Sequence, residues 1–256
     1  MGRLQKVFDQ KKEGVLNVYF TAGYPVLDST VSLMKTLQDE GVDIIELGMP
    51  YSDPLADGPV IQESSLVALK NGMSISTLFD QLKDFRKSIQ TPVILMGYMN
   101  PVLQYGFEKF CRDAAAVGID GLILPDLPPF EFESNYGKVI KECGLDFIFL
   151  VTPETSVERV KFLDNLSSGF LYAVSSSSTT GKEKNMHDVV EYVDRLKSYQ
   201  LKNPIMVGFG IKDKSTFEML KGHANGGIIG SAFIKALVSA NDYSTSAISF
   251  IRSILK

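Results

Sequence analysis

Short apolar runs, rich in β-branched and aromatic residues, alternate along the chain with longer stretches whose apolar positions recur at helical spacing. The apolar runs predict strands at residues 15–21, 42–47, 93–96, 121–124, 147–151, 170–174, 205–208 and 227–229. The longer stretches predict helices at residues 28–40, 75–89, 107–117, 132–143, 157–163, 186–199, 214–220 and 243–255. Because most intervals between strands leave room for a helical crossover, the strands are expected to pair in parallel.

Eight strands that alternate with eight helices predict an α/β fold, a single (β/α)8 TIM barrel domain over residues 1–256. The alternative is an open, doubly wound sheet. A dinucleotide-binding sheet of that kind carries Gly-x-Gly-x-x-Gly after its first strand, where this chain has Thr-Ala-Gly-Tyr-Pro at 21–25. The sequence shows no linker and no low-complexity tract, so one domain is the simpler interpretation.

Composition and charge narrow the class of protein. The chain of 256 residues has a net charge of −4 and no basic run, which disfavours binding to nucleic acid or to anionic membranes. No apolar run approaches the roughly 18 residues of a membrane span, and the first residues lack the apolar segment of a signal peptide. Two isolated cysteines, Cys111 and Cys143, suggest a reducing compartment. We therefore expect a cytoplasmic protein.

The rarity of histidine limits the kinds of catalytic site that the chain can form. The two histidines, His187 and His223, lie outside any metal-ligand spacing, and neither is near a Gly-x-Ser-x-Gly elbow, so we expect no metal. No predicted strand ends in a lysine, which disfavours an aldolase that works through a Schiff base. Acid–base chemistry by carboxyl groups remains as the main candidate.

Glu46 is the first such candidate. The strand predicted at 42–47 is apolar on both faces, as in a parallel sheet covered by helices, yet it places Glu46 near its end. Burying an unpaired carboxylate is costly, and conflicts of this kind collect at functional sites. The following loop is rich in proline and carries Asp53 and Asp57. We therefore expect Glu46 to be catalytic and to face a loop that carries a second acid.

Glycines after the last two predicted strands suggest a phosphate site. The seventh strand leads into Gly208-Phe-Gly-Ile211, and the eighth leads into Gly230-Ser231, where a short helix is expected to begin. Barrels commonly bind phosphate at these two places, through backbone N–H groups and the positive end of a helix. Thr180-Gly181, in the serine-rich loop after the sixth strand, is a possible third contributor. That loop is either a lid or a solvated loop, and the glycines taken singly also suit ordinary turns.

Taken together, these motifs resemble the α subunit of tryptophan synthase. The segment at 46–62 reads Glu-Leu-Gly-x-Pro-x-Ser-Asp-Pro-Leu-Ala-Asp-Gly-Pro-x-Ile-Gln, which is highly specific to that family. The resemblance continues through Met-Gly-Tyr-x-Asn-Pro at 96–101, Pro-Asp-Leu-Pro at 125–128, Tyr172, Thr180-Gly181 and the two late glycine motifs. It implies an eight-stranded β/α barrel that reversibly cleaves indole-3-glycerol phosphate into indole and glyceraldehyde 3-phosphate.

The resemblance also assigns roles to residues. It implies that Glu46 and Asp57 are the catalytic carboxyl groups, Glu46 as the general acid and Asp57 as the group that binds the indole N–H. The other implied substrate contacts fall into two sets: Gly181, Gly210, Gly230 and Ser231 around the phosphate, and Tyr19, Tyr98, Ile123 and Leu150 around the indole. Tyr172 matches a tyrosine near Glu46, and Thr180 matches a lid threonine that helps to order the loop around Asp57. Packing in the barrel core is the alternative for all of these positions, and for Ile123 and Leu150 individually it is the better interpretation.

By the same resemblance, the chain pairs with a tryptophan synthase β subunit in an α2β2 heterotetramer. Pyridoxal phosphate belongs to that partner, and no cofactor is expected in this chain. Ser176 and Ser178 depart from the arginine and glycine that many relatives have in the lid, which bears on lid closure and coupling. Three alternatives remain open: a stand-alone lyase that releases indole, a regulatory binding subunit, and another phosphate-binding barrel such as a thiamine-phosphate-type synthase.

Overall fold

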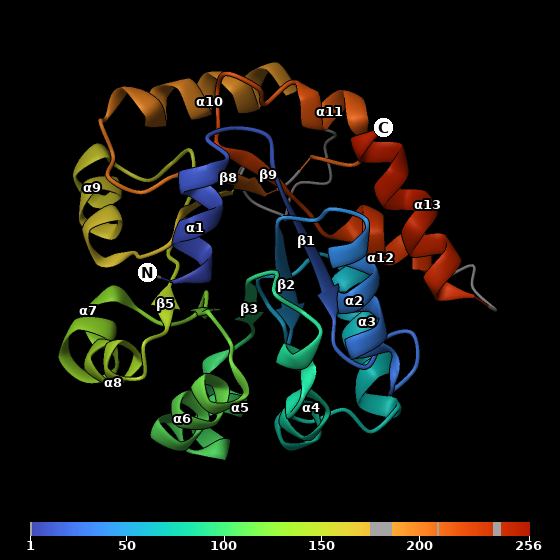
Figure 1. The fold of residues 1–256 in the computed structure, drawn as a ribbon. Helices are drawn as coiled ribbons and strands as arrows, with labels where there is room; N and C mark the ends of the chain where they lie inside the picture. The colour runs from blue at the N-terminus through green and yellow to red at the C-terminus, as the bar shows by residue number, and fades with distance from the viewer. Residues whose placement is uncertain (1, 175–185, 209, 238–241) are drawn as a thin grey trace.

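The computed structural model describes residues 2–174, 186–208, 210–237 and 242–256 (Figure 1). Within these ranges, parallel strands form one sheet in the order β5-β4-β3-β2-β1-β9-β8-β7-β6. The strands are β1 (Val15–Thr21), β2 (Ile44–Gly48), β3 (Val93–Met96), β4 (Gly121–Ile123), β5 (Asp146–Phe147), β6 (Leu150–Val151), β7 (Leu171–Val174), β8 (Ile205–Gly208) and β9 (Gly226–Ile229).

The first and last strands of this order, β5 and β6, are consecutive in the chain. Only Ile148 and Phe149 separate them. The Ile148 N–H donates to the carbonyl of Leu122 at 3.0 Å, and the carbonyl of Phe149 accepts from the Tyr172 N–H at 3.1 Å. One interrupted strand therefore joins β4 to β7 and brings the sheet round into a ring. The predicted barrel is confirmed, although the strand predicted at 147–151 consists of two short pieces.

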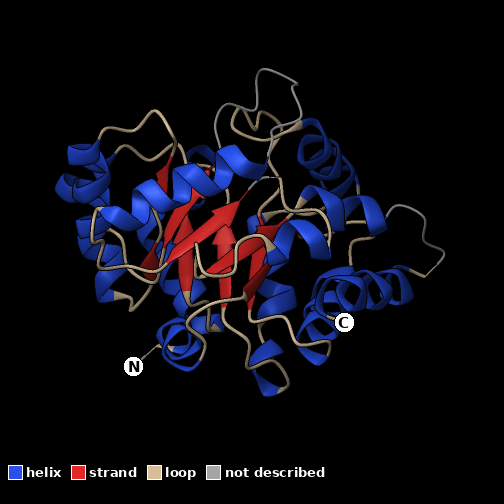
Figure 2. Cartoon of the chain, turned by 90° about the horizontal axis from the view of Figure 1, so that it is seen from above, coloured by secondary structure: helices blue, strands red, loops and turns tan. Residues whose placement is uncertain are grey.

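Helices surround the strands on all sides (Figure 2). In the described part of the chain they are α1 (Arg3–Gln10), α2 (Ser29–Asp39), α3 (Pro59–Lys70), α4 (Ile75–Leu82), α5 (Met99–Tyr105), α6 (Phe107–Val117), α7 (Pro129–Glu131), α8 (Gly137–Glu142), α9 (Val157–Leu166), α10 (Met186–Ser198), α11 (Lys214–Glu218), α12 (Ser231–Leu237) and α13 (Tyr243–Leu255). None of these described helices is long and apolar enough to cross a membrane.

Two predicted helices are shorter than expected. The helix predicted at 75–89 ends at Leu82, and a 3₁₀ turn at Phe85–Lys87 follows it. The helix predicted at 132–143 begins as a π-helical segment, Phe132–Tyr136, before α8. Helices α1, α3, α5 and α7 were not predicted. Of these, α3 and α5 lie within or beside the motifs of the strand-end loops.

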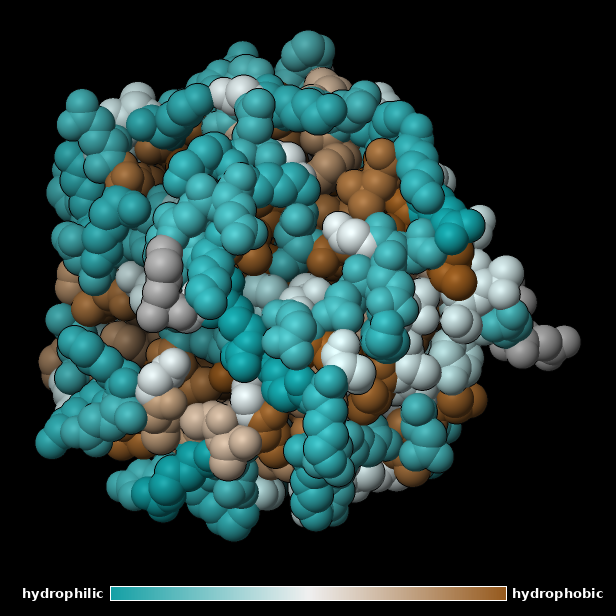
Figure 3. Space-filling model, viewed as in Figure 1, coloured by the Kyte–Doolittle hydropathy of each residue, from teal (hydrophilic) through white to brown (hydrophobic). Residues whose placement is uncertain are grey.

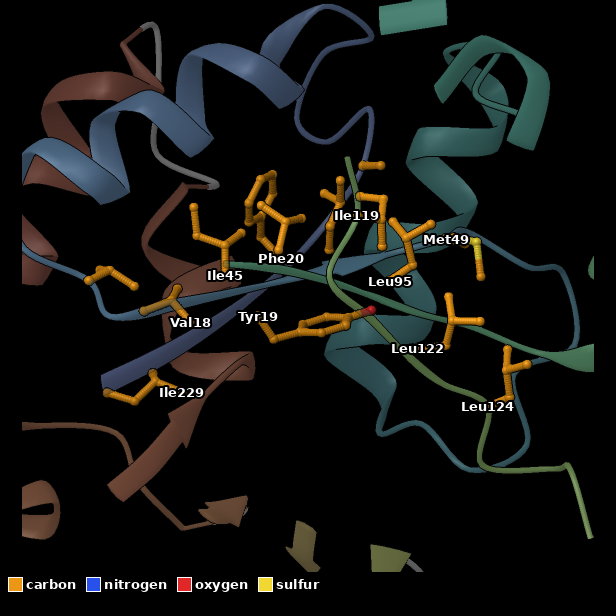
Figure 4. Close-up of a cluster of buried hydrophobic side chains, with 14 of the residues drawn as sticks. Val18, Tyr19, Phe20, Ile45, Met49, Leu95, Ile119, Leu122, Leu124 and Ile229 are labelled. Carbon is orange, nitrogen blue, oxygen red and sulfur yellow. The ribbon is translucent and has the colours of Figure 1, made fainter. Parts of the chain in front are cut away.

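The core has two layers, because successive residues of each strand point to opposite faces. The outer layer lies between the strands and the helices, and Figure 4 shows part of it, with Val18 and Phe20 of β1 and Ile45 of β2. Tyr19 lies on the other side of β1 from Phe20 in the same view. The inner layer fills the ring with mostly aliphatic side chains: Val15, Ile44, Ile94, Ile123, Ile148, Phe170, Tyr172, Met206 and Ile228.

Helix α1 covers one end of this inner layer (Figure 1). Leu4 and Phe8 are buried in it, and the Phe8 ring lies 6.2 Å from the Phe170 ring, centroid to centroid. On the face that carries α1, most of the surface is hydrophilic and the apolar side chains form separate groups (Figure 3). The N-terminal helix therefore closes the barrel from below and presents its polar side to solvent.

We expect Phe8→Ala to lower the free energy of unfolding by about 3–5 kcal/mol, because it leaves a cavity against Phe170 that the ring of strands cannot close. Urea denaturation followed by circular dichroism measures the change. The matched control is Gln5→Ala on the exposed side of α1, for which a change within about 0.5 kcal/mol is expected. Equal, small effects of the two substitutions would contradict the role given to α1.

Candidate active site

Glu46 stands inside the ring of strands. It is the third residue of β2, lies opposite Tyr19 of β1 and Ile94 of β3, and has no solvent-accessible surface. Two positions earlier on the same strand, Ile44 belongs to the aliphatic inner layer, so the period of two sends Glu46 inward as well. The sequence placed Glu46 near the strand end; in the structure it lies in the middle of β2.

The surroundings of Glu46 favour its neutral form. Burial raises the pKa of its carboxyl group to about 8, and a hydrogen bond from Asn17 opposes part of that rise. The Asn17 amide donates through Nδ2 to Glu46 Oε1 at 3.1 Å. The second carboxyl oxygen, Oε2, has no hydrogen-bond partner among the described residues. Near neutral pH this side chain therefore holds a proton that it can donate.

Asp57 belongs to the loop between β2 and α3, and it is half-buried. Its N–H donates to the carbonyl of Pro54 at 3.0 Å, and its own carbonyl accepts from Gln62 Nε2 at 2.9 Å. Burial raises the pKa of the Asp57 carboxyl group to about 6, against a hydrogen bond from Tyr98 that lowers it. Above that pH Asp57 is ionised while Glu46 stays protonated up to about pH 8, so the two acids differ in charge.

Tyr98 connects this loop to the strand end of β3. Its hydroxyl oxygen accepts from the Ala56 N–H at 3.1 Å, next to Asp57 in the chain. The Tyr51 ring lies 5.4 Å from the Tyr98 ring, and the Tyr51 hydroxyl accepts from Asn100 Nδ2 at 3.1 Å. The loop after β2 is therefore fixed to the start of α5, which places Asp57 over the ring of strands.

Tyr19 and Tyr172 face the two acids from β1 and β7. Burial raises the pKa of both phenols, and the charges of Glu46 and Asp57 raise it further, so both side chains are neutral at physiological pH. Their rings lie where a neighbouring strand has glycine. A Cβ atom on Gly48 would overlap the Tyr19 hydroxyl, and one on Gly208 would overlap the Tyr172 ring. These two glycines make room for the two rings.

Only part of the expected phosphate site lies in the described residues. Gly210 has a φ of +79°, a conformation that favours glycine, and follows β8. Gly230 lies beside Tyr19, since a Cβ atom there would be 3.4 Å from the ring, and α12 begins at Ser231. Thr180, Gly181 and the rest of the serine-rich loop at 175–180, including Ser176 and Ser178, lie outside the described residues.

The two aliphatic positions expected around an indole ring occupy different places. Ile123 is fully buried in the inner layer of the core. Leu150 is partly exposed and lines a cavity of about 130 Å³ at the ends of β4 and β6, together with Leu124 and Phe149. Neither Glu46 nor Asp57 lines this cavity, so the indole contact of Leu150 stays a prediction.

The sequence interpretation missed Asn17 and the contacts of Tyr51. Asn17 is fully buried, two positions before Tyr19 on β1. The polar residues Asn17, Tyr19 and Thr21 alternate with apolar ones along this strand, and that pattern was available as a signal. No group of three or more potential metal ligands occurs among the described residues.

The raised pKa of Glu46 has a consequence for stability. The unfolded chain releases this proton near the ordinary value of 4.5, whereas the folded chain holds it up to about pH 8. The stabilising contribution of Glu46 is therefore complete below pH 4.5 and is lost as the pH rises to about 8. The amide of Glu46→Gln stays neutral at every pH, so the stability of this variant does not fall for this reason as the pH rises.

We expect Glu46→Gln to raise the free energy of unfolding by about 2–4 kcal/mol near pH 9, and by under about 1 kcal/mol near pH 4.5. Urea denaturation at the two pH values measures the difference. The exposed substitution Glu133→Gln is the control, and it should show little dependence on pH. A stabilisation of the same size at both pH values would refute the assignment of a neutral, buried Glu46.

Comparison with known proteins identifies a family for the chain. The family model for the tryptophan synthase alpha chain matches residues 5–253. The tryptophan synthase alpha chain of Flavobacterium johnsoniae is 52% identical over 234 residues, which cover 91% of this chain and 92% of that protein. That of Parabacteroides distasonis is 48% identical over 240 residues and covers 93% of both.

Solved structures give the same result. The tryptophan synthase subunit alpha of Legionella pneumophila superposes with a TM-score of 0.91 at 36% identity, over 99% of this chain and 97% of that one. A chain of the tryptophan synthase of M. tuberculosis, in an aminoacrylate-bound form, superposes with a TM-score of 0.87 at 33% identity, over 99% and 98%. From the family model and these relatives together, the chain belongs to the tryptophan synthase alpha chain family.

Proposed function

We propose that Glu46 and Asp57 are the two acids with which this chain carries out the reaction of its family. That reaction cleaves indole-3-glycerol phosphate in tryptophan biosynthesis, and the chain is accordingly a lyase. The observation that carries the proposal is the difference between the two carboxyl groups: a buried Glu46 that holds its proton to about pH 8, and a half-buried Asp57 that releases its proton near pH 6.

The protonated Glu46 is suited to the first step. Breaking the bond between the indole ring and the glycerol chain is a retro-aldol reaction, and the ring leaves as a neutral molecule only if its third carbon is first protonated. Glu46 supplies that proton and becomes a carboxylate. Loss of the proton from the adjacent glycerol hydroxyl, to Glu46 or a neighbouring base, then gives the aldehyde as the carbon–carbon bond breaks.

The ionised Asp57 is suited to the charge that this step creates. Protonation at the third carbon leaves a positive charge on the ring nitrogen. A carboxylate that accepts a hydrogen bond from the ring N–H stabilises that charge until the bond breaks. Tyr98, which hydrogen bonds to Asp57 and binds the Ala56 N–H, keeps the loop in place for this contact.

The phosphate of the substrate is assigned to the loops after β8 and β9. Gly210 and Gly230 allow a close approach of the backbone, and the first turn of α12, from Ser231, offers N–H groups without partners inside the helix. The positive end of the helix favours an anion. Tyr19 lies beside Gly230 and faces Glu46, so a molecule held there reaches both the phosphate loops and the acid.

An exposed apolar rim supports the assignment of a β-subunit partner. Leu55, Leu103 and Phe130 are 92%, 48% and 72% exposed, and they lie in the segments that follow β2, β3 and β4. Parallel strands bring these segments to the same end of the barrel, above Glu46. We assign this rim to the β subunit of an α2β2 complex, which carries the pyridoxal phosphate, and we place the protein in the cytosol without a cofactor of its own.

The central experiment follows indole release from indole-3-glycerol phosphate by the full chain, with and without a β subunit. For Glu46→Gln we expect a loss of about 10²–10⁴-fold in kcat with normal folding, because the proton donor is gone. In the parent chain kcat/KM should fall below about pH 6 and above about pH 8, as Asp57 gains and Glu46 loses its proton.

The same assay separates the alternatives. Slow cleavage that rises sharply with a β subunit identifies an α chain completed by docking, whereas fast cleavage alone identifies a stand-alone lyase. The absence of cleavage in both conditions would leave a binding subunit. Turnover retained in Glu46→Gln would remove the general-acid assignment.

The phosphate assignment predicts that Gly210→Glu raises KM by at least about tenfold over Gly210→Gln, because a carboxylate repels the substrate phosphate. The two substitutions match in size and in backbone strain at the φ of +79°, so their difference isolates charge. Steady-state cleavage and binding of glycerol phosphate, followed by calorimetry, measure the effect. The same KM in both variants would place the phosphate elsewhere.

A further inference from the structure

Asn17 is an exception within the ring of strands. It is fully buried on β1 and stands opposite Ile44 of β2 and Ile228 of β9, both of which belong to the aliphatic inner layer. An aliphatic side chain would fill this place without the cost of removing an amide from water. Packing alone therefore gives no reason for an asparagine.

The contact of Asn17 gives that reason. Its Nδ2 donates to Glu46 Oε1 at 3.1 Å, inside the barrel and away from solvent. The remaining polar atoms of the pair, Asn17 Oδ1 and Glu46 Oε2, have no hydrogen-bond partner among the described residues. In each of the two side chains, therefore, one polar atom takes part in this hydrogen bond and the other has no partner among the described residues.

An amide suits a carboxyl group that changes its charge. The NH2 end stabilises a carboxylate, and the C=O end accepts from the O–H of a carboxylic acid. The two ends are similar in size, so a half-turn about the Cβ–Cγ bond exchanges them in the same space. A lysine or arginine at this position would hold Glu46 ionised, and a leucine would leave the carboxylate unpaired.

We propose that Asn17 is a positioning residue that holds Glu46 through both halves of its proton cycle. It donates to the carboxylate and, after the half-turn, accepts from the protonated acid. Asn17 itself neither gains nor loses a proton, so the number of protons transferred in the reaction is unchanged. The inference rests on the proposed acid–base role of Glu46.

The groups that face Glu46 allow a clean measurement. Among the described residues, the titratable groups whose charges interact with Glu46 are Tyr19 on β1 and Tyr172 on β7, and both phenols also interact with Asp57 in the loop after β2. The phenols have raised pKa values and stay neutral, and the pKa of Asp57 is about 6. The alkaline limb of kcat/KM, near the pKa of about 8, therefore reports Glu46.

The test compares Asn17→Leu and Asn17→Asp with the parent chain, in cleavage of indole-3-glycerol phosphate across pH. In Asn17→Leu, which keeps the size of the side chain, we expect kcat to fall about tenfold with KM within about twofold. Both hydrogen bonds of Asn17 are lost in this variant, and the one to the carboxylate is charge-assisted and therefore the stronger, so the alkaline limb should move up by about one pH unit. In Asn17→Asp, a second carboxyl group beside Glu46 should move the limb further upward.

Ile228→Val is the matched control, since it removes packing beside Asn17 without touching a polar group. It should lower the melting temperature and leave the alkaline limb in place. If Asn17→Leu does not fold, the alkaline limb of the kcat/KM profile of Asn17→Asp tests the inference instead. A folded Asn17→Leu with the parent kcat and limb, or a folded Asn17→Asp with an unmoved limb, would overturn the inference.

The two proposals fail in different ways. If Glu46→Gln keeps its turnover, the proposed acid is wrong, and the role of Asn17 falls with it. If Glu46→Gln is inactive but the Asn17 variants keep the parent pH profile, only the role of Asn17 is wrong. Binding of glycerol phosphate to each variant shows that its phosphate loops are folded.

Discussion

The removal of the Glu46 carboxyl group from water is the physical condition on which the candidate site depends. The ring of strands supplies it, because the aliphatic inner layer ends two residues below Glu46 on β2 and Tyr19 and Tyr172 flank the group above. In water, Glu46 would be ionised at neutral pH and unable to donate a proton. Inside the ring it stays neutral to about pH 8.

The same condition explains why the upper part of the ring differs from the lower part. Below Glu46, isoleucine, valine and phenylalanine fill the interior in the usual way of a barrel. At and above Glu46, two inward tyrosines lie against glycines, Tyr19 against Gly48 and Tyr172 against Gly208. These glycines leave the space in which the two rings lie across the neighbouring strands.

Much of this was predictable from the sequence. The apolar runs gave the strands and their parallel order, and the conflict of a carboxylate in an apolar strand pointed to Glu46 without any knowledge of its neighbours. Asp57 was different, because nothing in its loop distinguishes it from Asp53 except the resemblance to a family. Its pKa and its contact with Tyr98 come from tertiary structure.

The contact between Asn17 and Glu46 was missed because it depends on strand register. Asn17 reaches Glu46 because β1 and β2 pair Asn17 with Ile44 and Tyr19 with Glu46. The sequence of one strand alone does not determine how it pairs with its neighbour. The break at Ile148 and Phe149 and the π-helical segment also depend on packing between elements. One domain over residues 1–256 stays a prediction, as do the roles of Thr180 and Gly181, which lie outside the described residues.

The interrupted strand gives the barrel a seam. Five residue pairs join β1 to β2, whereas two join β4 to β5 and two join β6 to β7. Glu46 and Asn17 stand on the side with the longest ladder, and Tyr172 stands on β7, at the edge of the seam. The wall that carries the acid is therefore joined by more backbone pairs than the two joints on either side of the interrupted strand.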